Sequence, residues 1–115
     1  MRRLSISAKR PGKRRGATLE LVEAAARLLA VDDGTIKARL LAAFTDQLQY
    51  VVQAEVPVEL VSRLVSIRQR LGAPGGRGSH SSVESAIDRM TVADAVKIAA
   101  DIFDFHVALS CALYH

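Results

Sequence analysis

Residues 25–40 have the sequence AARLLAVDDGTIKARL, in which two apolar runs meet across a short polar turn. On both sides of the turn the apolar residues recur at spacings of three and four, the period of a helix buried along one face. Asp32-Asp33-Gly34 favours the end of one helix, and Thr35 is a good N-cap for the next. The stretch therefore predicts two helices joined by a tight turn.

The same periodicity extends the two helices outward and predicts a third. The first helix is expected to begin at Thr18, a good N-cap, and the second to run from about Thr35 to about Ala54. Pro57 suits the first turn of a third helix, and Gly72 suits its C-terminal cap.

Two capping patterns predict the remaining helices. Ser81 lies three residues before Glu84, and Thr91 three residues before Asp94. A short helix and a long one are expected there, over residues 82–90 and 91–114.

Composition agrees with an all-helical core. Of 115 residues half are hydrophobic and only 4% aromatic, with no Trp, so Leu, Val, Ile and Ala must fill the interior. We expect an all-α fold, a small bundle of four to five helices with a flexible basic N-terminal arm. Residues 17–115 are expected to form one helical domain, with a flexible loop at 72–80 that holds four glycines and one proline.

The basic arm, residues 1–16, carries seven positive charges and no negative one. Its cations are Arg2, Arg3, Lys9, Arg10, Lys13, Arg14 and Arg15. Residues 17–115 hold the other nine basic residues and all twelve acidic ones, a net charge of −3. With Pro11, Gly12 and Gly16 among its charges, the arm is expected to be disordered and to order on a polyanionic partner.

The cysteine content and the length of the apolar runs predict a cytoplasmic protein. A single cysteine, Cys111, cannot form an internal disulfide, and its apolar neighbours predict that it is buried. No secretory segment or membrane span is expected, because no apolar run is long enough and free of charge.

The stretch from Val31 to Leu40, VDDGTIKARL, resembles the turn and recognition helix of Fis-type helix-turn-helix DNA-binding proteins. In that register Ala26 is the small residue at the helix crossing, and Leu29, Val31, Ile36 and Leu40 point inward. The match covers residues 22–41.

The resemblance implies that the start of the second helix faces the DNA major groove or its phosphates. Arg39 would contact a guanine, and Thr35 and Lys37 would contact phosphates. Two positions depart from the family pattern: Ala30 stands where the turn usually has Gly, and Asp33 where relatives often have a basic residue.

A plain helical hairpin is the alternative interpretation, since two amphipathic helices joined by an Asp-Asp-Gly turn occur in any helical bundle. Three arginines of the third helix would either extend a basic patch or form an ordinary solvated face, namely Arg63, Arg68 and Arg70.

The sequence leaves two candidate functions open. The first is a small DNA-binding regulatory protein, with DNA favoured over RNA. The second is a helical protein–protein interaction module, such as an inhibitor, adaptor or accessory factor, whose basic arm docks an acidic partner or binds nucleic acid non-specifically.

Signals for catalysis are poor. His106 is displaced from the acidic face formed by Asp94, Lys97, Asp101 and Asp104, and no second His or Cys stands at metal-ligand spacing. Packing is therefore the expected role of His106. We expect no enzyme activity, no cofactor and no metal.

The rest of the 91–114 helix is apolar. Its apolar surface is broader than the other helices of one small domain can bury. The charged residues of this helix end at Asp104. The expected self-association residues of a homodimer are therefore Phe105, Leu109 and Leu113, which follow it.

Overall fold

The computed structural model describes the backbone of residues 6–74 and 79–113, and the side chains in these ranges from residue 16 onward. This part of the chain is all-α and has no strand, which confirms the expected fold class. Its five α-helices are α1 (Ile6–Val31), α2 (Ile36–Asp46), α3 (Val61–Arg70), α4 (His80–Arg89) and α5 (Val92–Leu113). Three 3-10 turns separate α2 from α3, namely η1 (Leu48–Tyr50), η2 (Gln53–Glu55) and η3 (Val58–Leu60).

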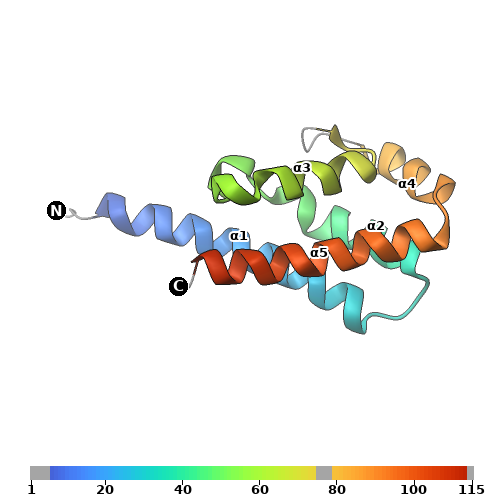
Figure 1. Cartoon of the computed structure of the whole chain (residues 1–115), viewed down its shortest axis with the longest axis horizontal. Coiled ribbons are helices and arrows are strands. Elements are labelled where there is room, and N and C mark those ends of the chain that lie inside the picture. Colours follow the sequence, from blue (N-terminus) through green and yellow to red (C-terminus); the bar gives the residue numbers. More distant parts are fainter. Residues whose placement is uncertain (1–5, 75–78, 114–115) are drawn as a thin grey trace.

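The two long helices, α1 and α5, lie side by side and antiparallel, so that α1 begins at the end of the bundle where α5 finishes (Figure 1). Helix α2 packs against α1, α5 and α4, and α3 packs against α5. The core between them is aliphatic, as the composition predicts. Its largest fully buried side chains are Phe44, Phe105, Leu40, Leu48, Leu64, Leu71, Ile87, Ile102 and Leu109.

The turn between α1 and α2 has the predicted form. Helix α1 ends at Val31, and Gly34 has a φ of 104°, a conformation that suits glycine. The Thr35 Oγ1 accepts a hydrogen bond of 3.1 Å from the Ala38 N–H and caps α2.

Helix α1 begins at Ile6 and not at the expected N-cap Thr18, so it includes residues 6–16 of the basic arm. Lys, Arg and Ala favour helix, whereas Pro11 and Gly12 within the same segment disfavour it. Extending a packed helix costs less than nucleating a new one. Thr18 lies inside the helix and is buried, and its Oγ1 donates to the Glu55 Oε1 at 3.4 Å. Residues 1–5 of the arm lie outside the described residues.

Helix α2 ends at Asp46, although its apolar period continues to about Ala54. The cause is Arg68 of α3, whose guanidinium donates hydrogen bonds to the carbonyl oxygens of Leu48, at 3.1 Å, and of Val51. These bonds hold the chain after α2 in 3-10 turns instead of an α-helix.

Arg68 is therefore not part of a solvated face. Its side chain is only 4% exposed, and burial lowers the pKa of its guanidinium from the ordinary value. The two carbonyl oxygens that accept from its Nη2 offset part of the cost of burying this cation, while its Nε is buried without a hydrogen-bond partner among the described residues.

Gly72 ends α3 with a φ of 79°, as predicted, and lies against α4. A Cβ on Gly72 would come within 2.8 Å of the Ala86 Cβ. Ala73 is fully buried, so the start of the expected flexible loop is packed, and residues 75–78 lie outside the described ranges. Helix α4 starts earlier than predicted, because Ser79 and not Ser81 caps it: the Ser79 Oγ accepts from the Ser82 N–H at 3.0 Å.

The start of α5 matches the sequence prediction. The Thr91 Oγ1 accepts a hydrogen bond of 3.0 Å from the Asp94 N–H. Asp101 of this helix forms an ion pair with Arg70 of α3.

Arg68→Ala is expected to lower the free energy of unfolding by about 2–4 kcal/mol, because it removes the donor to two backbone carbonyls and leaves a cavity. Urea unfolding monitored by circular dichroism measures the loss. Arg63→Ala is the control, since Arg63 is exposed on the same helix and its loss should change stability by about 0.5 kcal/mol or less. Equal effects of the two substitutions would contradict the assigned role of Arg68.

Candidate functional site

The expected DNA-reading helix is α2, and the structure places its two cations against backbone carbonyls. The Arg39 Nη1 donates a hydrogen bond of 2.6 Å to the carbonyl oxygen of Leu29, in the last turn of α1. The Lys37 Nζ donates to the carbonyl oxygen of Asp88, in the last turn of α4, at 3.2 Å. Both cations thus occupy helix C-termini, where carbonyl oxygens favour positive charge.

Helix α2 is also closed on most of its surface. Of its side chains, only those of Ala38 and Asp46 are exposed, while the others are buried or half-buried. Its first turns face α4 across a cleft of about 310 Å³. The cleft is lined by Thr35, Lys37, Ala38, Leu41, Glu84, Ile87 and Asp88. A helix that enters the major groove needs a row of exposed side chains, and α2 does not present one.

The register of the turn differs from that of a helix-turn-helix as well. Ala30, at the expected turn position, is helical, and the positive φ falls on Gly34. Val31, expected to point inward, is 72% exposed. Ala26, Leu29 and Leu40 are buried as expected, but these contacts occur equally in a plain helical hairpin.

Carboxylates surround the N-terminus of α2. Asp32 and Asp33 are exposed in the turn, and Glu84 and Asp88 are exposed on the facing side of α4. Their charge repels phosphate, so the electrostatics of this corner do not favour a nucleic-acid backbone.

The basic arm lies away from that corner. The backbone of residues 6–15 forms the first turns of α1, which extend past the end of α5 (Figure 1). Five of the predicted phosphate-binding residues lie on these turns, namely Lys9, Arg10, Lys13, Arg14 and Arg15. Arg2 and Arg3 lie outside the described residues. The structure thus separates the predicted phosphate-binding residues of the arm from those of α2 instead of bringing them together.

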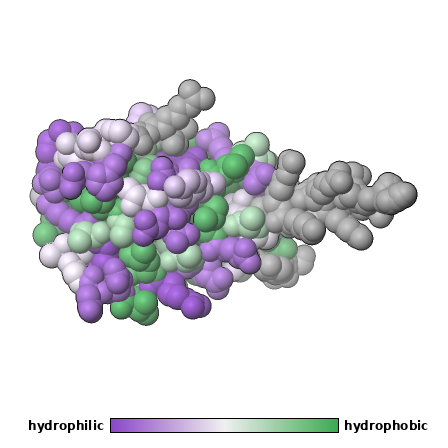
Figure 2. All heavy atoms as spheres, turned by 180° about the vertical axis from the view of Figure 1, so that it is seen from behind, coloured by the Kyte–Doolittle hydropathy of each residue, from purple (hydrophilic) through white to green (hydrophobic). Residues whose placement is uncertain are grey.

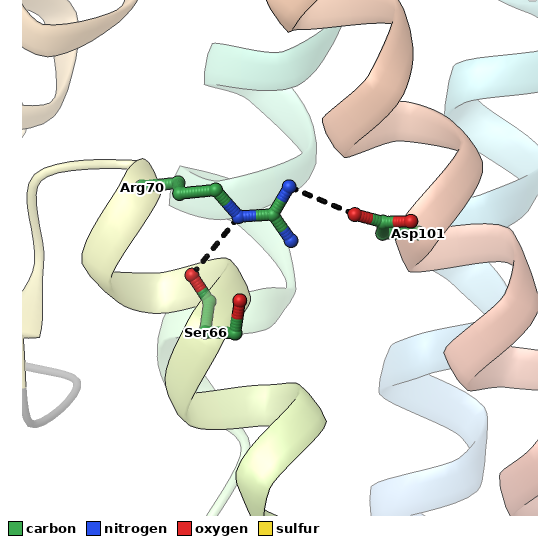
Figure 3. Close-up of polar contacts among 3 residues, drawn as sticks. All are labelled: Ser66, Arg70 and Asp101. Atoms are coloured by element: carbon green, nitrogen blue, oxygen red, sulfur yellow. Dashed lines mark hydrogen bonds and ion pairs between the residues drawn. The ribbon is translucent and has the colours of Figure 1, made fainter.

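A second polar cluster joins α3 to α5. The Arg70 Nη1 lies 2.8 Å from the Asp101 Oδ2, and the Arg70 Nε donates to the Ser66 carbonyl oxygen at 3.3 Å (Figure 3). A pocket of about 330 Å³ beside it is lined by Ser62, Arg63, Ser66, Ile67, Arg70, Asp101 and Asp104. The two arginines and two carboxylates balance, and the ion pair is about one-third exposed. The cluster therefore acts as a modest link between helices.

The structure buries two of the three predicted self-association residues of α5 in the chain's own core. Phe105 and Leu109 are fully buried against the chain's own core, and Leu113 packs partly against it. The large apolar side chains that α5 exposes are instead those of Val92, Val96, Phe103 and Val107. Sequence reasoning missed them because α5 is apolar on more than one face, although their spacing of four and seven residues was a visible signal.

The large exposed apolar side chains of α5 are Val92, Val96, Phe103 and Val107. Cys111, expected to be buried, is also exposed. On the opposite side of the molecule from the view of Figure 1, hydrophobic areas are scattered among hydrophilic ones (Figure 2).

His106 is half-buried and packs near Phe103, with ring centroids 6.2 Å apart. Within the described ranges, no three His, Cys, Asp or Glu side chains gather to form a potential metal site. Across the same part of the chain, no helix combines the length and apolar character needed to cross a membrane.

Comparison of the chain with protein-family models, curated proteins and solved structures finds no match.

Arg39→Ala is expected to lower the free energy of unfolding by about 1 kcal/mol, because Arg39 bonds the end of α1. It should leave relative affinity for different DNA duplexes unchanged. Arg27→Ala, an exposed substitution on α1, is the control and should alter neither property. Chemical unfolding and titration of two unrelated duplexes measure both. A loss of duplex preference in Arg39→Ala without a loss of stability would support a base contact instead.

Proposed function

We propose that this chain is a small helical interaction module that binds the phosphate backbone of nucleic acid through its basic arm, without reading base sequence. The observation that carries the proposal is the separation of charge. Seven cations and no anion lie in residues 1–16, whereas residues 17–115 have a net charge of −3. Attraction to polyanions is therefore confined to one end of the molecule.

The affinity of such a segment comes from counterion release. Each phosphate that a Lys or Arg neutralises frees condensed cations from the nucleic acid, and this gain depends on salt but not on base sequence. Phosphate contacts position a protein on a duplex and carry no sequence information of their own. The arm is sufficient for this kind of binding.

The surroundings of α2 support backbone binding over base reading. Lys37 and Arg39 bond backbone carbonyls within the bundle, and exposed carboxylates flank the helix start. The DNA-binding regulatory function implied by the Fis-type resemblance stays a prediction, and it would require α2 to separate from α4.

Replacement of all seven arm cations by Gln tests the proposal. Gln keeps the helix propensity of Lys and Arg, so helicity should change little while duplex affinity falls strongly. The slope of log affinity against log salt should flatten by about 0.9 for each phosphate that the arm no longer neutralises. Fluorescence anisotropy with random duplexes across a salt series measures both.

The matched control neutralises three exposed cations of the bundle, Arg27, Arg63 and Arg89, by the same replacement with Gln. This variant should bind nearly as the parent does. Retention of tight, sequence-selective binding by the arm variant would overturn the proposal in favour of a regulator. Failure of the parent to bind any duplex would overturn it in favour of an acidic protein partner.

A further inference from the structure

Helix α5 carries an apolar surface that the described part of the chain leaves exposed. We call it the α5 stripe, and its members are Val92, Val96, Ala100, Phe103, Val107 and Cys111, all exposed. With about 100° between successive residues, these six positions fall within about 100° of the helix circumference. The four large side chains are 45–61% exposed. Figure 1 shows α5 running along one side of the bundle with no element in front of it.

The stripe is symmetric along the helix axis. Val92 and Val107 lie at equal distances from the midpoint between Ala99 and Ala100, and so do Val96 and Phe103. The two residues at the midpoint are small, which allows another backbone to approach closely. A twofold axis through this midpoint would place each large apolar residue of one copy opposite a large apolar residue of another.

Charges beside the stripe favour the same symmetry. Lys97 and Asp104 flank it on one side, and they are seven residues apart, about 10 Å along the axis, so they do not meet within one chain. In an antiparallel pair this flank faces the same flank of the other copy, and Lys97 would lie about 3 Å along the axis from the other copy's Asp104. In a parallel pair it would face the opposite flank, which carries Ala99 and His106 and no carboxylate.

We propose that a second copy of this chain packs antiparallel on the α5 stripe, about a twofold axis at Ala99 and Ala100. The interface is not the one built on Phe105 and Leu109, because those side chains fill the chain's own core. Opposite charges meet only in the antiparallel orientation, and they select it over the parallel one.

The antiparallel arrangement also affects how the dimer would bind nucleic acid, an argument that rests on the proposed function. Helix α1 begins at the end of the bundle where α5 finishes. An antiparallel α5 pair therefore carries its two basic arms at opposite ends, where they can bind separate stretches of one nucleic acid and raise the avidity of the dimer.

Cysteine crosslinking tests the register directly. In a Cys111→Ser background, Val92→Cys and Val107→Cys are prepared separately, then oxidised mildly alone and as an equal mixture. The mixture should give a disulfide-linked dimer, because residue 92 of one copy faces residue 107 of the other. Each variant alone should not, since two residues 92 lie about 22 Å apart along the axis.

Two results would overturn the proposal. Efficient disulfides in either single-variant sample would show a parallel or different pairing. Absence of any crosslink in the mixture, with a monomer mass for the parent in sedimentation at about 100 μM, would show that α5 does not self-associate.

Charge exchange provides a second readout on the full chain. Lys97→Glu should weaken the dimer at least tenfold in sedimentation equilibrium, and Lys97→Glu combined with Asp104→Lys should restore most of it. Phe103→Asp should give a folded monomer, while Tyr50→Asp, also at an exposed aromatic but outside α5, should leave the dimer intact. Equal weakening by Tyr50→Asp, or no rescue by the double exchange, would contradict the pairing.

Discussion

The buried guanidinium of Arg68 is the interaction on which the rest of the fold depends. It bonds the carbonyl oxygens of Leu48 and Val51, and it ends α2 at Asp46 by holding the following chain in 3-10 turns. Those turns bring α3 back against α5, where Arg70 meets Asp101. A straight helix to residue 54 would carry α3 away from the bundle. The buried Arg68 side chain thus stabilises a turn of the chain between α2 and α3, within a sequence whose apolar period would otherwise favour one long helix.

The closed environment of α2 is the structural basis for proposing phosphate binding instead of base reading. Neighbours on three sides bury or half-bury most of its side chains, and its cations bond the ends of α1 and α4. Hydrogen bonds of this kind link α2 to the ends of α1 and α4 and help to hold the bundle together. Two features favour contacts with partners: the charge of the basic arm favours phosphate, and the exposed α5 stripe favours an apolar helix. They lie on different parts of the chain and serve different kinds of contact.

The number of helices and most helix ends were predictable from the sequence. Which face of a helix is buried was not predictable in every case. Gly34, Gly72 and Thr91 act as predicted, because a cap or a positive φ depends on a few neighbouring residues. The end of α2 was not predictable, since the apolar period continues past it and the competing bonds come from Arg68, more than fifteen residues away. The face of α5 was not predictable because Phe103 and Phe105 are equally apolar, and only packing against the other helices decides which is buried.

The sequence by itself determined the all-α class, the tight turn at residues 32–35 and the separation of charge between the arm and the bundle. These follow from composition and from interactions within about one helical turn. Tertiary structure decided that Lys37 and Arg39 face helix ends, that Arg68 is buried, and that the α5 stripe is left open. Burial depends on which elements meet in space, and a helix with two apolar faces carries no local signal that tells them apart.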